Sequence, residues 1–206
     1  KEPFLKMRHQ GMILGPDGKK MSKSKGNVVN PDDVIKDYGA DTLRVYEMFM
    51  GPIYSDKPWD DGACNGIYRF LMRVYNFIIL PANISSQTSK ECEVLLNKTI
   101  KKVTEDIEVL KFNTAIASMM EFVNYLYKNK CVLSQQDAKN FVKILSPFAP
   151  FVTEELFKIL GGKPSVHLQD WPKAIDISVD LQVNIPIQVN GKLKAQMSVL
   201  SSDIED

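Results

Sequence analysis

Four lysines fall within seven residues near the N-terminus, at positions 19–25; two serines lie among them, and a Gly-Asn pair follows at 26–27. Ammonium groups are compact, mobile charges for phosphoryl oxygens, hydroxyls and backbone N–H groups add donors, and glycine allows the backbone to approach closely. These residue types at this spacing favour a phosphate-binding loop. Composition alone favours a solvated basic loop, so the neighbouring segments must decide between the two.

The charge distribution agrees with an anionic ligand at the N-terminal end. Over the whole chain of 206 residues, 26 Lys and Arg balance 25 Asp and Glu. Residues 1–30 nevertheless hold seven basic and two acidic side chains, whereas residues 170–206 hold three basic and six acidic ones.

The 44% hydrophobic and 25% charged fractions are typical of a soluble globular protein, and no apolar run is long enough to span a membrane.

The cysteines, Cys64, Cys92 and Cys131, are odd in number, far apart and in no CxxC pair. This pattern predicts neither a disulfide framework nor a zinc site, and it favours a reducing, cytoplasmic location. The chain begins at Lys1 without an initiator methionine or a signal peptide, so we expect it to be a piece of a longer protein.

The segments around the lysines predict how they are held. A short apolar run at 12–14 leads into Gly-Pro-Asp-Gly at 15–18, which is typical of a strand followed by a type I turn. The segment is no Walker loop, because Lys20 stands where Ser or Thr is required and Ile13 where glycine is required. Asn30-Pro31 predicts a capped helix start, and 40–50 a second helix on whose surface Asp41 and Arg44 could pair.

From residue 60 onward, apolar side chains recur at helical spacing, and short polar connectors predict antiparallel neighbours. The stripes are Ile67, Phe70, Leu71, Val74 and Ile78; Leu96, Ile100, Val103, Ile107 and Leu110; Ile116, Met119, Met120, Val123 and Tyr127; and Phe141, Ile144, Leu145 and Phe148, with a further helix from about Thr153. The fold class is therefore predicted as mainly α, an antiparallel helix bundle behind the lysine segment, with a C-terminal β-hairpin.

Two arginines mark the polar side of the first bundle helix. Arg69 and Arg73 lie four residues apart and so share a helix face, opposite the apolar stripe. Guanidinium groups at this pitch can straddle neighbouring phosphates of a nucleic acid. Solvated arginines fit the spacing equally well.

The predicted hairpin follows Trp171-Pro172, where apolar and polar residues alternate on both sides of Asn190-Gly191. A two-residue loop would mix the faces. A three-residue loop, 189–191, with the glycine left-handed, pairs Ile187 with Leu193, and we predict that arrangement.

Residues 20–24, Lys-Met-Ser-Lys-Ser, are identical to the KMSKS signature of class I aminoacyl-tRNA synthetases. The flanks at 10–14, 25–31, 38–44 and 47–52, and later stretches at 68–71, 165–168, 171–172 and 189–193, resemble leucyl-tRNA synthetases of bacterial type. The resemblance covers nearly the whole chain. It also likens the bundle to the anticodon-binding domain of that family.

The resemblance implies amino-acid activation. Leucine attacks the α-phosphate of ATP, pyrophosphate leaves, and leucyl-adenylate acylates tRNA(Leu). Lys23 is expected to be the main phosphate contact, with Lys20 in support as the second catalytic residue. The ATP-binding loop is then completed by Met21, Ser22 and Ser24. Gly26 would be a hinge, Mg²⁺ would accompany ATP without a metal site in this chain, and Arg69 and Arg73 would contact tRNA.

The departures from the family define the expected domains. Two histidines a few residues apart, which form the other class I signature, do not occur, since the histidines are His9 and His167. We expect the nucleotide-binding half, the leucine pocket and the editing domain upstream of Lys1, and the fragment to be inactive alone. The expected division is 1–58, the end of the catalytic domain; 59–168, the helix bundle; and 169–206, a linker and hairpin of a truncated C-terminal domain. An isoleucyl or valyl enzyme, or a freestanding tRNA-binding helical module, stays open as an alternative.

Overall fold

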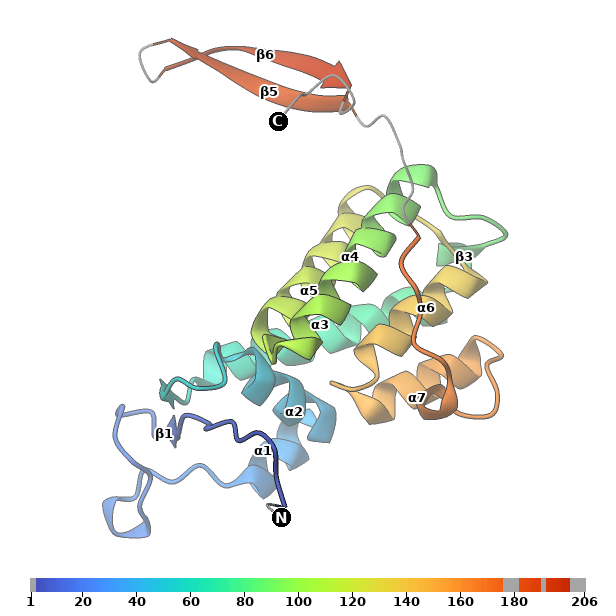
Figure 1. Ribbon diagram of the computed structural model, residues 1–206. Helices are drawn as coiled ribbons and strands as arrows, with labels where there is room; N and C mark the ends of the chain where they lie inside the picture. The colour runs from blue at the N-terminus through green and yellow to red at the C-terminus, as the bar shows by residue number, and fades with distance from the viewer. Residues whose placement is uncertain (1–2, 176–181, 190–191, 201–206) are drawn as a thin grey trace. The chain divides into compact units, whose positions relative to one another are not determined.

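The computed structural model describes residues 3–175, 182–189 and 192–200. The chain divides into two compact units, Lys1–Ala174 and Ile175–Asp206 (Figure 1). The helices of the described residues all belong to the first unit. They are α1 Pro31–Tyr38, α2 Ala40–Phe49, α3 Asp61–Ile79, α4 Lys90–Glu108, α5 Phe112–Lys128, α6 Gln135–Leu145 and α7 Pro150–Ile159, with three 3-10 turns, η1 Lys23–Lys25, η2 Pro81–Asn83 and η3 Val166–Leu168.

Two short parallel strand pairs tie distant segments of the first unit together. β1, Ile13–Leu14, pairs with β2, Lys57–Pro58, and β3, Ile84–Ser85, pairs with β4, Leu133–Ser134. The first pair matters for the lysine segment. It fixes the residues that precede the lysines against the residues that lead into α3.

Several helices begin at the polar residues that capping requires. Asn30 is the N-cap of α1 and accepts a hydrogen bond from the backbone N–H of Asp32 at 3.2 Å. Asp60 caps α3 by accepting from two backbone N–H groups of the first turn, and Ser134 caps α6. Each cap satisfies donors that a first helical turn leaves without a partner.

Helix α7 is capped by a distant part of the chain. The residue before α7 offers no side-chain acceptor, and the Asp41 carboxylate on α2 accepts instead, from the backbone N–H of Val152 at 2.7 Å and of Phe151 at 3.3 Å. Arg44, also on α2, donates to the carbonyl of Pro147 at 3.1 Å. The expectation that Asp41 and Arg44 pair with each other is therefore wrong, because both side chains join α2 to the residues around the start of α7.

The helices enclose one continuous apolar core. The predicted stripes line it, as shown by Ile67, Leu96 and Phe141, each exposed by 2% or less. Leu110 does not belong to its predicted stripe, because α4 ends at Glu108. Burial of such side chains contributes roughly 1.5–3 kcal/mol each. Tyr127 departs from its predicted stripe and is 41% exposed, because its hydroxyl donates to the backbone carbonyl of Arg73 at 2.9 Å and so stays at the edge of the core.

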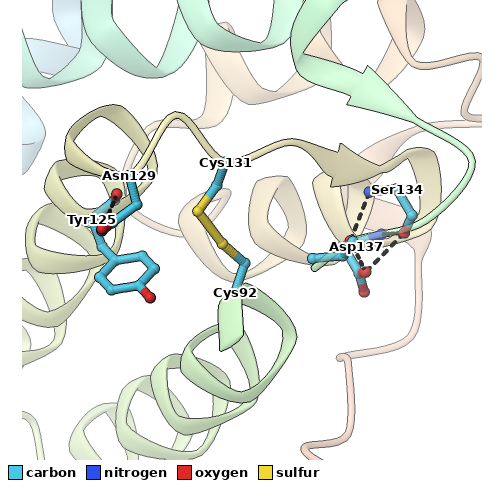
Figure 2. Close-up of a disulfide and its surroundings, with 7 residues drawn as sticks. Cys92, Tyr125, Asn129, Cys131, Ser134 and Asp137 are labelled. Atoms are coloured by element: carbon cyan, nitrogen blue, oxygen red, sulfur yellow. Dashed lines mark hydrogen bonds between the residues drawn. A yellow bond between two sulfur atoms is a disulfide. The ribbon is translucent and has the colours of Figure 1, made fainter. Parts of the chain in front are cut away.

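A disulfide joins Cys92 to Cys131 across the α4–α5 hairpin (Figure 2). The prediction of no disulfide is therefore wrong, because it weighed a separation of 39 residues along the chain and not the distance in space. Two antiparallel helices bring the start of the first and the end of the second to the same end of the hairpin. Cys92 lies in the first turn of α4 and is buried, Cys131 follows α5 and is half-buried, and Cys64 is a buried free thiol.

The second unit forms the predicted hairpin within its described residues. Its antiparallel strands are β5, Gln182–Val189, and β6, Lys192–Leu200. The predicted pairing is wrong, because Val189 pairs with Lys192 and Ile187 with Ala195. Two residues separate the strands, and a register shift next to Ile187 leaves Lys194 as an extra residue, which restores the alternation that a two-residue loop alone would break. The predicted conformation of the loop glycine lies outside the described residues.

The predicted fold class, mainly α with a helix bundle and a C-terminal hairpin, is confirmed. Over the described residues, no helix combines the length and the apolarity needed to cross a membrane.

Candidate functional site

The lysine loop, residues 19–27, leaves the protein from a fixed base. β1 pairs with β2, and the carbonyl of Leu14 accepts a hydrogen bond from the backbone N–H of Trp59 at 3.0 Å. Leu14 also forms a bridge with Lys20 on the far side of the turn. Trp59 is buried against Tyr46, with ring centroids 4.7 Å apart, so the strand that enters the loop is tied to the core.

The turn between the strand and the loop forms where it was predicted. The Gly18 N–H donates to the Gly15 carbonyl at 2.9 Å, which is the first-to-fourth-residue hydrogen bond of a β-turn. The Gly15 N–H donates in return to the Lys19 carbonyl at 2.8 Å. Gly18 has a φ of 70°, in the left-handed region that glycine adopts without strain.

A single 3-10 turn, η1, shapes the second half of the loop. Ser22 precedes it in an extended conformation, and the Ser22 and Ser24 hydroxyl oxygens lie 2.8 Å apart. The Lys25 N–H donates to the Ser22 carbonyl at 3.0 Å, and Gly26 ends the turn with a φ of 66°. Lys23 and Lys25 are left exposed.

Met21 is the apolar anchor of the loop. Its side chain is half-buried and packs against the core, and it lines a small cavity of about 130 Å³ together with Ile13, Leu43 and Trp59. The loop therefore has one inward-facing residue between two exposed lysines, Lys20 and Lys23. This division keeps the backbone near the protein while the ammonium groups stay in solvent.

Asn27 was not predicted as a site residue, yet it holds the loop at three points. Its side-chain Oδ1 accepts from the Ser22 backbone N–H at 2.8 Å. Its Nδ2 donates to the Asp17 carboxylate at 3.0 Å and to the Lys20 carbonyl at 3.3 Å. The sequence signal was present, since an Asn that follows a left-handed glycine at a loop end is suited to local backbone hydrogen bonds.

The electrostatics leave the loop lysines available to an anion. The salt bridges of the described residues, Lys102–Asp106 and Lys158–Glu154, lie in the bundle, so none of them engages the loop. Asp17 is the acid of the adjoining turn. Hydrogen bonds from the Asn27 amide and then from the Lys19 backbone N–H lower the pKa of the Asp17 carboxyl, so it stays charged to a lower pH than an ordinary aspartate.

The loop can therefore bind a polyanion such as the phosphates of a nucleotide, through ammonium groups, serine hydroxyls and an exposed backbone. Among the residues that the structure describes, no group of three or more His, Cys, Asp or Glu side chains is placed to hold a metal ion.

The two predicted tRNA contacts lie on α3 but in different surroundings. Arg69 is exposed. Arg73 is half-buried, donates to the Asn124 Oδ1 at 2.6 Å and lies 4.6 Å from the centre of the Tyr127 ring. Arg73 thus already contributes to the packing of α3 against α5, which the spacing of two arginines could not reveal.

Two family models match the chain. The model described as anticodon-binding domain of tRNA ligase matches residues 90–204, and the model described as tRNA synthetases class I (I, L, M and V) matches residues 1–60. The first covers more than half of the chain, so the chain belongs to the anticodon-binding domain family of tRNA ligases. The second covers the lysine loop and places the KMSKS residues in a class I synthetase segment.

The chain is similar to a leucine–tRNA ligase and to a solved LeuRS. One, from Bdellovibrio bacteriovorus, is 47% identical over 203 residues, which are 96% of this chain and 25% of that protein. The solved ternary complex of Agrobacterium radiobacter K84 agnB2 LeuRS with tRNA and LeuAMS matches with a TM-score of 0.79 and 30% identity, over 99% of this chain and 29% of that chain. The resemblance to leucyl-tRNA synthetases is thereby confirmed, and the chain spans about a quarter of the length of the curated relative.

A more distant structure shares the fold. The Mycobacterium tuberculosis methionyl-tRNA synthetase in complex with methionyl-adenylate matches with a TM-score of 0.56 and 16% identity, over 75% of this chain and 38% of that chain. At this identity the match shows the fold alone.

Proposed function

We propose that the chain is a segment of a leucine–tRNA ligase, the enzyme that activates leucine with ATP to leucyl-adenylate and transfers it to tRNA(Leu). The observation that carries the proposal is the lysine loop. It lies in a segment that matches class I tRNA synthetases, and that segment is followed by a helix bundle that matches the anticodon-binding family. The leucine pocket lies outside this chain. The segment supplies phosphate-binding groups and a tRNA-binding body, and it is inactive alone.

Lys23 and Lys20 are the proposed catalytic residues. When leucine attacks the α-phosphate, negative charge builds on the departing pyrophosphate, and ammonium groups brought against that charge stabilise the transition state more than the ground state. Lys23 opens η1 and is exposed, while Lys20 stands across the turn on the same loop. Mg²⁺ would enter with ATP, as is usual for phosphate substrates.

The remaining residues of the ATP-binding loop, Met21, Ser22 and Ser24, shape it. Met21 packs against the core and keeps the loop backbone in place. Ser22 and Ser24 are within hydrogen-bond distance of each other and would turn their hydroxyls to phosphate oxygens when ATP binds. Gly26, in its left-handed conformation, is the proposed hinge about which the loop closes.

The bundle is the proposed contact for the tRNA body, through Arg69 and Arg73 on α3. Arg69 is exposed and would bind phosphate directly. Arg73 already has intramolecular partners, so its contact would come from the guanidinium edge that Asn124 leaves open.

The proposed domain division is 1–58, the end of the class I catalytic domain; 59–168, the helix bundle; and 169–206, a linker and hairpin. The class I match over residues 1–60 supports the first boundary. We place the parent enzyme in the cytoplasm, where its substrate tRNA is found. The cysteines do not support this placement, because Cys92 and Cys131 form a disulfide.

Two other assignments were open from the sequence. An isoleucyl or valyl enzyme shares the KMSKS signature, but the 47% identity to a leucine–tRNA ligase favours leucine. A freestanding tRNA-binding module would lack amino-acid activation altogether. Exchange of pyrophosphate into ATP by the full-length protein, measured with leucine, isoleucine and valine in turn, tests all three assignments: leucine alone should support the exchange.

A further inference from the structure

We infer that Asn27 is a positioning residue for the reaction, whose side-chain amide holds the lysine loop in the shape that delivers Lys20 and Lys23 to the ATP phosphates. The inference rests on the proposed function. Asn27 would touch no substrate. It would act through the backbone of the loop.

The amide fixes two neighbouring peptide units at once. Its Oδ1 accepts from the Ser22 N–H at 2.8 Å and its Nδ2 donates to the Lys20 carbonyl at 3.3 Å. These two backbone groups flank Met21. One half-buried side chain therefore sets the direction in which the chain leaves Lys20 and enters η1, where Lys23 lies.

Only an amide can make this set of contacts. A carboxylate would accept from Ser22 but could not donate to the Lys20 carbonyl, and a hydroxyl is too short to replace both ends. The second donor of Nδ2 is used as well, because the Asp17 carboxylate accepts it at 3.0 Å. Asp17 in turn accepts from the Lys19 backbone N–H at 3.1 Å, so the amide links the turn, the loop and the start of η1.

The backbone around this link leaves no room for a side chain at Gly15. A Cβ atom there would lie 2.8 Å from the Asn27 carbonyl oxygen, 2.8 Å from the Asp17 carboxylate and 2.9 Å from the Asn27 amide nitrogen. Gly15 is buried and its φ lies outside the left-handed region, so what requires glycine here is the close approach of Asn27. Gly15→Ala is a second, independent way to push Asn27 away from Asp17.

The consequence for the reaction is preorganisation. A loop that is already folded loses less conformational freedom when it closes on ATP, and a displacement of about 1 Å at a reacting group can lower a rate by roughly 100-fold. Loss of the Asn27 contacts should therefore lower kcat. It should leave the KM for leucine unchanged, since leucine binds elsewhere.

The test is leucine-dependent exchange of pyrophosphate into ATP, measured on the full-length protein. We expect Asn27→Ala to lower kcat by about 10- to 100-fold with an unchanged KM for leucine. Asn140→Ala is the matched control, because Asn140 is also half-buried but accepts from Gln136 on α6. Full kcat in Asn27→Ala would overturn the inference.

An exchange of the two side chains separates positioning from general damage. Asn27→Asp places two carboxylates in contact and should be at least as impaired as Asn27→Ala. Combining it with Asp17→Asn restores a donor and an acceptor in reversed order, so kcat should partly recover. A double variant no better than Asn27→Asp alone would contradict the role of the Asp17 contact.

A readout on the 206-residue chain does not depend on the amino acid activated. Trypsin should cut after the loop lysines faster in Asn27→Ala and Gly15→Ala than in the unaltered chain or in Asn140→Ala. Equal cleavage rates would overturn the inference even if leucine exchange is found. Suppose instead that the full-length protein shows no exchange, but that trypsin still cuts the Asn27→Ala chain faster. This result would refute the proposed function and support the role of Asn27 in holding the loop.

Discussion

The carboxylate of Asp41 accepts a hydrogen bond from the backbone N–H of Val152 at 2.7 Å, so a residue 111 positions earlier in the chain caps α7. Asp41 is only 8% exposed and takes a second hydrogen bond from Phe151. The hydrogen bonds thereby join α2, the second helix after the lysine loop, to the start of α7. The segment that carries the lysine loop and the bundle share one core.

Asp41→Ala should lower the free energy of unfolding by about 1–3 kcal/mol, because it leaves two backbone donors at a helix start without an acceptor. Asp41→Asn keeps one acceptor oxygen and should lose less. Urea unfolding of the 206-residue chain measures both. Asp37→Ala, an exposed change on α1, is the control, and equal midpoints for Asp37→Ala and Asp41→Ala would refute the cap.

Reduction of the Cys92–Cys131 disulfide should destabilise the first unit. Closing a loop of 39 residues removes chain entropy from the unfolded state, and the expected loss on reduction is about 2–4 kcal/mol. The measurement is urea unfolding with and without reductant. Cys131→Ser should be insensitive to the reductant.

Thiol counting gives a direct check of the same disulfide. Alkylation of the unfolded, unreduced chain should label Cys64 alone, and prior reduction should allow all three cysteines to react. Three labelled thiols without reduction would show that the disulfide does not form.

Stability should fall in acid through Glu154. Its carboxylate accepts from the Ser165 hydroxyl at 2.7 Å and from the Val166 backbone N–H at 3.0 Å, and these hydrogen bonds, with a smaller contribution from Lys158, lower its pKa. A carboxyl whose pKa is lowered on folding stabilises the protein above its unfolded-state pKa, about 4.3, and loses that contribution as the pH falls through the lowered value.

The loss of stability is measured as the fall in Tm from neutral pH to pH values below the lowered pKa of Glu154. Glu154→Gln should show a flatter decline of Tm in acid than the unaltered chain. Glu155→Gln, an exposed neighbour on α7, should decline as the unaltered chain does. Parallel curves for all three would contradict the assigned role of Glu154.

Loss of Arg69 should affect tRNA binding, whereas loss of Arg73 should also affect the stability of the bundle. Arg69→Ala in the full-length protein should weaken tRNA binding and reduce the dependence of log K on log salt by about one unit, whereas Arg69→Lys keeps the charge and the slope. Arg73→Ala should also destabilise the bundle, by about 0.5–1 kcal/mol, because it removes the contact with the Tyr127 ring. Unchanged tRNA affinity and salt slope in Arg69→Ala would refute the contact.

Much of the fold could be predicted because it is encoded locally. The apolar spacing around Ile67 and Phe141 identifies a buried helix face, and Asn30 identifies a helix start, without knowledge of any partner. The β-turn at 15–18 follows in the same way from its proline and glycines.

The errors at Asp41 and at the disulfide concern partners that are distant in sequence, whereas the error in the hairpin is local. The sequence predicts Asp41 as a surface acid, because no neighbouring residue indicates that its partner is a backbone N–H of α7, 110 positions later. Cys92 and Cys131 meet only when two helices run antiparallel. In the hairpin, alternation predicts a three-residue loop that keeps apolar residues on one face. The structure instead has a bulge at Lys194, which does the same with two residues between the strands.

The candidate site likewise has some features that a local motif predicts and others that depend on the fold. Its lysines were predictable from a motif, and Met21 from its place inside that motif. The hydrogen bonds of Asn27 to Ser22 and Asp17 depend on a path of the backbone that no spacing rule specifies.

The most direct test of the central claim is leucine-dependent exchange of pyrophosphate into ATP by the full-length protein, compared with its Lys23→Ala variant. We predict exchange in the unaltered protein and a kcat about 100- to 1,000-fold lower in Lys23→Ala, the loss typical when one donor to developing negative charge is removed, with the KM for leucine unchanged. Undiminished exchange in Lys23→Ala would contradict the account.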